Sequence, residues 1–204
     1  MKQIGVDFID ILFGFVVAEI FAAFTTVQGN EYASWANLIL ALAIVVFSWL
    51  GYHKAKDAYS RTISFRDPSI IQFLIDVGVV ALYLALVKQS EHAQAVARLA
   101  PHQPLSIRPQ AITIIAIFGL YLIWDLLQIH LADDSKKSQA TEHTWWSFGF
   151  FVAFAVYSAI IIWVWRPNSN ETIVIADAVY LLLTYLYRLN PPSEEIASAA
   201  VATA

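Results

Sequence analysis

The sequence contains no cysteine among its 204 residues. Disulfide bonds, thiol catalysis and cysteine-ligated metals are therefore excluded, while the redox compartment stays open. Charged residues are also scarce, at 14% of the chain, against about 25% in a soluble domain. With only seven glycines, the chain has no glycine-rich phosphate loop. These deficits, together with 59% hydrophobic residues and a mean hydropathy of +0.61, are typical of a membrane protein.

An excess of positive charge is missing as well, since the net charge is −4 and the pI is about 5.7. Nucleic acid is not an expected partner, because proteins bind it through basic surfaces. No Ser-His-Asp set can be placed at one depth in the membrane, so we do not expect an enzyme. His53 and His130 lack the second pair that would favour haem, and we expect neither a cofactor nor a metal.

Long apolar runs dominate what is present. A spanning helix needs about 20 mostly apolar residues, and six segments qualify: 4–27, 33–52, 69–88, 109–131, 145–165 and 171–188. The sequence therefore predicts an all-α polytopic membrane protein with a single six-helix domain over residues 1–190. A flexible polar tail is expected over 191–204. The first run is longer than the core of a signal peptide, about 7–15 residues, and is interrupted by acids.

The basic residues between these segments predict the orientation, because they accumulate on the cytoplasmic side. With the N-terminus inside, eight Lys and Arg residues lie inside and four outside. We therefore expect both termini in the cytoplasm and the chain in the plasma membrane. After the third segment, the polar stretch that opens at Ser90 predicts a separate short surface helix with Ser90 as its N-cap.

The first apolar run, Ile4–Val27, carries Asp7, Asp10 and Glu19. An acid facing lipid costs about 2.5–3.5 kcal/mol on insertion scales, so such residues usually face protein or water. Glu19 lies about 13 Å further along the helix than Asp10, near the middle of the membrane. No Lys or Arg is expected at that depth. Glu19 is therefore predicted to be protonated, to hydrogen-bond a neighbour, or to face water or a cation.

Other polar residues are expected to meet at one level. The second helix returns Trp49 and His53 to the level of Asp10, and the third helix brings Asp76 near. This cluster is either a structural knot that satisfies buried polar groups or a proton-sensitive site, because it pairs a histidine with carboxylates.

Two further acids lie in the later helices. Asp125 and His130, near the end of the fourth helix, have the same two interpretations, and Asp125 should face another helix. Asp177 is interpreted as an acid of the first turn of the sixth helix, where the helix dipole favours it.

A family resemblance rests on two motifs. The stretch Phe8–Asp10 (FID) resembles the Phe-Ser-Asp motif that opens the first helix of the lysosomal and endosomal potassium-channel family, including its six-helix prokaryotic members. The stretch Ser48–Lys54 (SWLGYHK) is similar to that family's Trp-x-x-His-His followed by a basic residue. Three positions depart from the pattern: Ile9 replaces the serine, Tyr52 replaces the first histidine, and Ile4 stands where the family has arginine. The resemblance covers mainly residues 1–54, so the chain would be a divergent member.

In that family the first helices of several subunits line a cation pore, and the motif anchors each helix near its cytoplasmic end. The resemblance implies an anchoring network of Phe8, Asp10, Trp49, His53 and Asp76. It also implies a pore face of Phe15, Ala18, Glu19 and Ala22, with Phe15 as an apolar gate. The same side chains are equally compatible with ordinary helix packing.

Three functions follow as expectations. The first is a homo-oligomeric channel, by resemblance a tetramer, that passes a monovalent cation, by implication potassium, across the lipid bilayer. The second is a proton- or cation-coupled secondary transporter with Glu19, Asp76 and Asp125 around a cavity inside each protomer. The third is a non-catalytic membrane subunit or sensor.

Overall fold

A computed structural model describes residues 4–27, 32–58, 69–99, 106–131 and 134–189. Within them the chain is helical, as the sequence predicts. The elements are α1 (Ile4–Thr26), α2 (Tyr32–Ala58), α3 (Ser69–Leu99), α4 (Arg108–Leu131), α5 (Asp134–Ala159), a short π-helix η1 (Ile160–Trp165) and α6 (Asn170–Leu189). The predicted tail over 191–204 lies outside these ranges.

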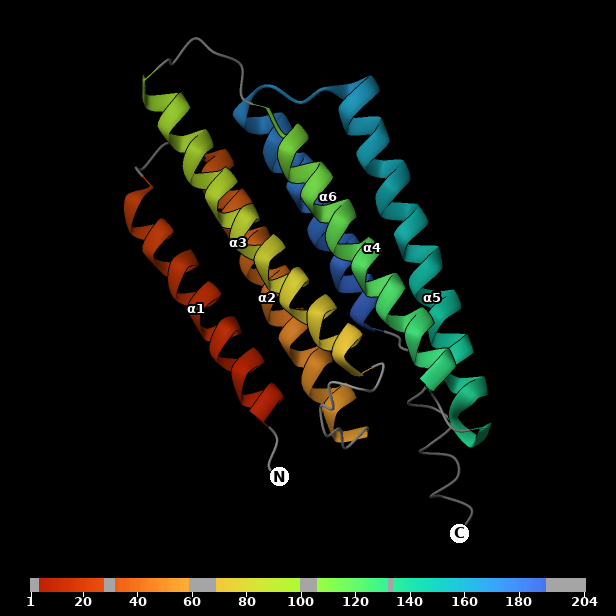
Figure 1. Ribbon diagram of the computed structural model, residues 1–204. Coiled ribbons are helices and arrows are strands. Elements are labelled where there is room, and N and C mark those ends of the chain that lie inside the picture. The colour runs from red at the N-terminus through yellow and green to blue at the C-terminus, as the bar shows by residue number, and fades with distance from the viewer. Residues whose placement is uncertain (1–3, 28–31, 59–68, 100–105, 132–133, 190–204) are drawn as a thin grey trace.

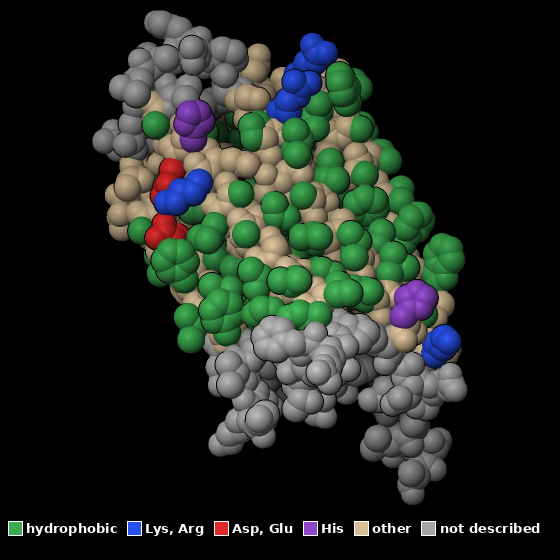
Figure 2. All heavy atoms as spheres, viewed as in Figure 1, with side chains coloured by type: hydrophobic (Ala, Val, Ile, Leu, Met, Phe, Trp, Pro, Cys, Tyr) green, Lys and Arg blue, Asp and Glu red, His purple; other side chains and the backbone are tan. Residues whose placement is uncertain are grey.

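Six of the described helices are long and apolar enough to cross a membrane, with η1 continuing α5. Spanning segments of this number and length are those of a multi-pass membrane protein. The outer surface agrees, because Figure 2 shows hydrophobic side chains over most of the middle of the bundle and charged ones mainly toward its ends. The side of the membrane on which the termini lie stays a prediction.

Successive helices alternate in direction, so that α1 begins and α6 ends at the same end of the bundle (Figure 1). We call this the proximal end and the opposite one the distal end. Helix α1 lies at one edge of the bundle, against α2 and α3, and α5 lies at the other edge. Helix α2 packs on α1, α3 and α6. Half of its membrane-spanning window is buried, compared with 28% for α1 and 22% for α5.

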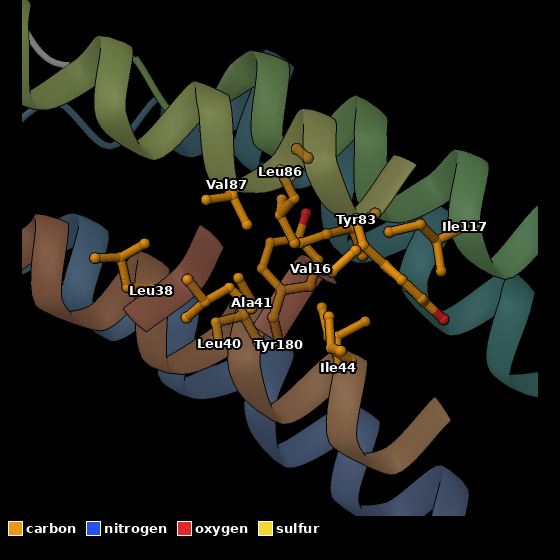
Figure 3. Close-up of a cluster of buried hydrophobic side chains, with 14 of the residues drawn as sticks. Val16, Leu38, Leu40, Ala41, Ile44, Tyr83, Leu86, Val87, Ile117 and Tyr180 are labelled. Carbon is orange, nitrogen blue, oxygen red and sulfur yellow. The ribbon is translucent and has the colours of Figure 1, made fainter. Parts of the chain in front are cut away.

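The core lies where α1, α2, α3, α4 and α6 meet. Figure 3 shows Val16 of α1, Ile44 of α2, Tyr83 of α3, Ile117 of α4 and Tyr180 of α6 within one cluster of buried side chains. The inward face of α1 reaches it through residues at helical spacing: Ile9, Phe13, Val16, Ile20 and Ala23. In lipid these contacts stabilise by close packing more than by exclusion of water.

Helices α1 and α3 run parallel and in register. At the proximal end the rings of Phe8 and Phe73 lie 6.0 Å apart. At the distal end the Thr26 hydroxyl donates a hydrogen bond to Gln94 Oε1 at 3.1 Å. Residues of α1 therefore meet residues of α3 that lie 65 to 70 positions later in the chain.

The third helix differs from the sequence expectation. We predicted a span ending at Lys88 and a separate helix capped by Ser90, but α3 continues unbroken to Leu99. The Ser90 hydroxyl donates to the carbonyl oxygen of Leu86 at 3.2 Å, as a mid-helix serine does. Hydropathy falls after Lys88, yet the Glu, Gln and Ala residues that follow favour helix, so the helix does not end where its apolar stretch does. Helix α5 likewise begins at Asp134, well before the predicted residue 145.

The end of the fifth span has an unusual backbone. After the π-turns of η1, Arg166 adopts a left-handed conformation (φ 50°, ψ 60°) and its N–H donates to the carbonyl oxygen of Ile161 at 2.9 Å. A non-glycine residue in this region is strained by about 1–2 kcal/mol. Replacement by glycine removes this strain, but part of the gain in stability is lost because glycine has more conformational freedom in the unfolded state.

We expect Arg166→Gly to raise the free energy of unfolding by about 0.5 kcal/mol. Arg166→Val should lower it by about 1 kcal/mol or more, because a β-branched side chain tolerates positive φ poorly. Unfolding in mixed micelles, followed by tryptophan fluorescence, measures both variants. A glycine variant less stable than the valine variant would contradict the conformation assigned to Arg166.

Candidate functional site

One face of helix α1 is left exposed by the other described residues. Its exposed residues recur at intervals of three and four: Phe8, Ile11, Phe15, Ala18, Ala22 and Thr25. Within the described residues, α1 has its main contacts with α2 and α3, and both lie on the opposite face. The structure therefore places Phe15, Ala18 and Ala22, three of the four predicted pore residues, together on this stripe. We call it the outer stripe of α1.

Asp10 lies at the proximal end of α1, turned toward α2. Its Oδ1 accepts a hydrogen bond from Trp49 Nε1 at 3.3 Å and lies 3.0 Å from His53 Nε2. The two aromatic rings stack edge to face, with centroids 4.5 Å apart. Both the Asp10 and the His53 side chains keep about a third of their surface exposed. Three of the five predicted anchoring residues thus form one network that joins α1 to α2.

The other two residues of the predicted network, Phe8 and Asp76, have neighbours on other helices or lie on α3. Phe8 is 43% exposed and its ring faces Phe73 of α3, so it belongs to the α1–α3 contact. Asp76 lies on α3 and is half-buried.

Glu19 has a basic partner, contrary to the sequence expectation. Lys88 Nζ lies 2.9 Å from Glu19 Oε2 and 2.9 Å from Glu91 Oε2. The prediction was wrong because α3 does not end at Lys88, so this lysine lies on a continuing helix at the level of Glu19. The Glu19 side chain keeps 29% of its surface exposed and Lys88 keeps 57%. Figure 2 shows such a mixed group of acidic and basic side chains at the α1 edge of the bundle.

A second set of polar contacts, not predicted from the sequence, lies inside the bundle. The Tyr121 hydroxyl of α4 hydrogen-bonds both Ser48 of α2 and Tyr83 of α3. The Arg188 guanidinium of α6 lies over the Tyr121 ring, 5.9 Å from its centroid. It also packs so closely on Gly51 that a methyl group there would overlap it. From the sequence Arg188 is only the last residue of the sixth apolar segment, because hydropathy does not reveal that a side chain at a helix end turns inward.

Asp125 of α4 faces α5, as expected, but its histidine is not His130. The Ser147 hydroxyl donates to Asp125 Oδ2, and His143 Nδ1 lies 3.4 Å from Asp125 Oδ1. Ser147 also hydrogen-bonds the Tyr187 hydroxyl at 3.1 Å. His143 lies outside the predicted segment 145–165, and the early start of α5 is what brings it to Asp125.

Asp177 is not an acid of the first helical turn. It is the eighth residue of α6 and only 2% exposed, and the first-turn acid is Glu171. Its Oδ1 accepts a hydrogen bond from Gln110 Nε2 at 2.7 Å, while its Oδ2 has no hydrogen-bond partner.

The acids are therefore distributed over separate contacts. Glu19 is paired between α1 and α3, whereas Asp125 and Asp177 are buried among α4, α5 and α6. Over the part of the chain that the structure describes, no three His, Asp or Glu side chains are grouped to hold a metal ion.

Comparison with known proteins adds no further constraint. No family model matches the chain, and no curated protein or solved structure is significantly similar to it.

Proposed function

We propose that the chain is one subunit of a homo-oligomeric channel for monovalent cations in the plasma membrane, with α1 of each subunit lining the pore. The observation that carries the proposal is the outer stripe of α1. Among the described residues the middle of this face, from Ile11 to Ala22, is exposed, while α2 and α3 hold α1 on the other side. Around a symmetry axis, several copies of this stripe would enclose a path.

The residues of the outer stripe suit that role. Ala18 and Ala22 leave room for an aqueous path, and Phe15, 52% exposed, projects a large apolar ring. A ring of phenylalanines narrows a pore and gates it by dewetting. The Asp10–Trp49–His53 network would fix α1 at its proximal end. Glu19 contributes less negative charge than expected, because Lys88 neutralises it. Potassium as the ion and four as the number of subunits rest on the sequence resemblance.

The transporter with Glu19, Asp76 and Asp125 around one cavity has less support, because Glu19 and Asp125 lie in different halves of the bundle. A non-catalytic subunit or sensor would leave the outer stripe as a docking or lipid-facing surface. Two measurements distinguish both alternatives from a channel: the flux of ions through the protein, and the identity of the surfaces that contact α1 in the assembled protein.

Potassium flux from proteoliposomes tests the proposal. We expect the wild-type protein to release potassium down its gradient and Phe15→Ala to raise the initial rate several-fold, because the smaller side chain removes the apolar constriction. The matched control is Phe148→Ala, which truncates a ring that is 44% exposed on α5, at the other edge of the bundle. A rate equal to that of empty vesicles, or an unchanged rate in Phe15→Ala, would refute the assigned pore.

The absence of native cysteine makes the arrangement of subunits directly accessible. We expect Ala22→Cys to be joined between copies by a short thiol-specific cross-linker, giving a ladder that ends at the full oligomer. Val156→Cys, at an exposed position of α5, should stay monomeric under the same treatment. Cross-linking through α5 and not through α1 would place α1 away from the axis.

A further inference from the structure

Arg188 is the last residue but one of α6, and its side chain extends toward α2 and α4. The guanidinium carbon lies 5.9 Å from the centroid of the Tyr121 ring and 5.0 Å from that of the Tyr187 ring. The guanidinium also occupies the space that a side chain at position 51 of α2 would need, which Gly51 leaves free. The arginine as a whole is half-buried. We call the guanidinium, with Tyr121, Tyr187 and Gly51 around it, the Arg188 niche.

The charge of the Arg188 niche has no anionic partner among the described residues. In that part of the chain no carboxylate lies within ion-pair distance of the guanidinium, and none of its N–H groups donates a hydrogen bond. Asp125, on the neighbouring α4, contacts Ser147 and His143 instead. A charge that is partly removed from water is unfavourable unless a partner replaces the lost hydration. The niche therefore combines an uncompensated charge with unused donors.

The two aromatic rings do not supply that partner. Tyr121 and Tyr187 attract the positive charge through the faces of their rings. The N–H groups of an arginine, however, lie in the guanidinium plane as a fork that matches two oxygens of a phosphate or a carboxylate. Rings that contact the guanidinium hold this fork in place and leave its donors for an anion with several oxygens.

The Arg188 niche lies close to the proximal surface of the membrane. Gly51 is two residues before the end of the membrane-spanning part of α2, Tyr32–His53, and α6 ends one residue after Arg188. Lipid headgroups, with their phosphates, begin where the hydrocarbon core ends. Basic pockets between membrane helices at this level are known to hold such headgroups. The guanidinium is therefore within reach of lipid phosphates and of phosphate dissolved in the adjacent water.

We propose that the Arg188 niche binds a phosphate group at the proximal surface of each protomer, through the N–H groups of the guanidinium. The group belongs to an anionic phospholipid or to a free phosphate ion, and the experiment below distinguishes these two sources. The site is separate from the outer stripe of α1, and it does not depend on the proposed channel. Because the guanidinium contacts α2, α4 and α6, a bound phosphate stabilises the contact of these helices.

Gly51 provides a way to move the guanidinium without removing its charge. A methyl group at position 51 overlaps the guanidinium, which is the far end of a flexible side chain. In Gly51→Ala the arginine can therefore turn away while the helices keep their places. A purely structural role for Arg188 does not make the protein respond to phosphate. The phosphate site predicts that displacing the guanidinium and removing it both abolish that response.

The unfolding temperature of the full chain in neutral detergent micelles tests the site. It is measured by tryptophan fluorescence with added phosphatidylglycerol, inorganic phosphate, or a phosphate-free glucosyl diacylglycerol. We expect phosphatidylglycerol or inorganic phosphate to raise it in the wild type, because a ligand of the folded state stabilises that state. The glycolipid should not. Arg188→Gln and Gly51→Ala should each weaken the apparent affinity at least about tenfold, because the charge-assisted contact is lost.

Three further variants serve as controls, and size-exclusion profiles establish that each is folded. Gly149→Ala adds a methyl group at an exposed glycine of α5 that has free space around it, and should bind as the wild type does. Arg108→Gln removes an exposed arginine that also lies over an aromatic ring, that of Trp163 at 5.5 Å, and should likewise leave the affinity unchanged. Arg188→Lys keeps the charge without the fork and should weaken binding several-fold.

The outcomes identify the source of the phosphate or overturn the site. A response to phosphatidylglycerol alone assigns the site to a lipid headgroup, and a response to inorganic phosphate assigns it to the free ion as well. No response to either in the wild type would overturn the inference. So would wild-type affinity in both Arg188→Gln and Gly51→Ala, or an equal loss in Arg108→Gln. Absence of potassium flux would refute the proposed pore and leave the phosphate site standing.

Discussion

Replacing Phe154 with alanine should lower the free energy of unfolding by about 3 kcal/mol. The Phe154 side chain is fully buried on α5. Its ring stacks on Phe118 of α4 at 3.7 Å and lies parallel to the Tyr180 ring of α6, 6.2 Å away. One side chain thus joins three helices. Truncation in a core typically costs about 3–5 kcal/mol, and the lower value applies because transfer into lipid contributes little to helix association in a membrane.

The matched control is Phe148→Ala, on the same helix but 44% exposed. Its ring packs chiefly on Trp145, so its loss should lower the free energy of unfolding by less than about 1 kcal/mol. Equilibrium unfolding in mixed detergent micelles, monitored by tryptophan fluorescence, compares the two variants. Equal destabilisation by both would mean that the α4–α5–α6 contact is not packed as described.

Removing the Asp125 side chain should have the second largest effect, about 2–3 kcal/mol. Both of its carboxylate oxygens contact α5, one through Ser147 and the other through His143. Hydrogen bonds between membrane helices average about 0.6 kcal/mol and reach about 1.7 kcal/mol, so the Ser147 hydrogen bond and the longer His143 contact together set the expected size. Asp125→Ala also leaves the buried Ser147 hydroxyl with fewer partners, which adds to the loss.

Asp125→Asn is the matched variant, because it preserves the shape and one acceptor oxygen. It should retain more than half of the stability that Asp125→Ala loses. The same unfolding measurement on Asp125→Ala in a Ser147→Ala background tests the coupling, since the two losses should then be less than additive. Additive losses would show that the two side chains do not interact.

The helices themselves could be predicted from the sequence, because length and hydropathy determine which segments can span a bilayer. The errors lie at polar helix ends. Helix α3 passes Lys88 without a break, and α5 begins before its apolar stretch does. Hydropathy averages over a window and therefore misses a helix that continues into polar residues. Because these helix ends were misplaced, the contacts of Lys88 with Glu19 and of His143 with Asp125 were not predicted.

One contact of the candidate site could be predicted from the sequence. Asp10, Trp49 and His53 could be placed together from depth alone, since two antiparallel helices return to the same level. The buried polar residues of α6 were not predicted as a group, although Asp177, Tyr180, Thr184 and Tyr187 share one face of the helix. A helical spacing of polar residues inside an apolar segment was the available signal. What the sequence does not contain is the identity of the facing helices, which follows only from packing.

The contact between α2 and α6 has a consequence for how the chain is made. Three whole helices separate these two neighbours in the sequence, so α2 enters the membrane long before its partner is synthesised. Until then one of its faces must be covered by lipid or by an insertion factor, even though α2 is the most buried helix of the finished bundle. Assembly therefore cannot proceed strictly from the N-terminus. A nascent chain stopped after α5 should be sensitive to proteolysis, and release of α6 should confer resistance on α2.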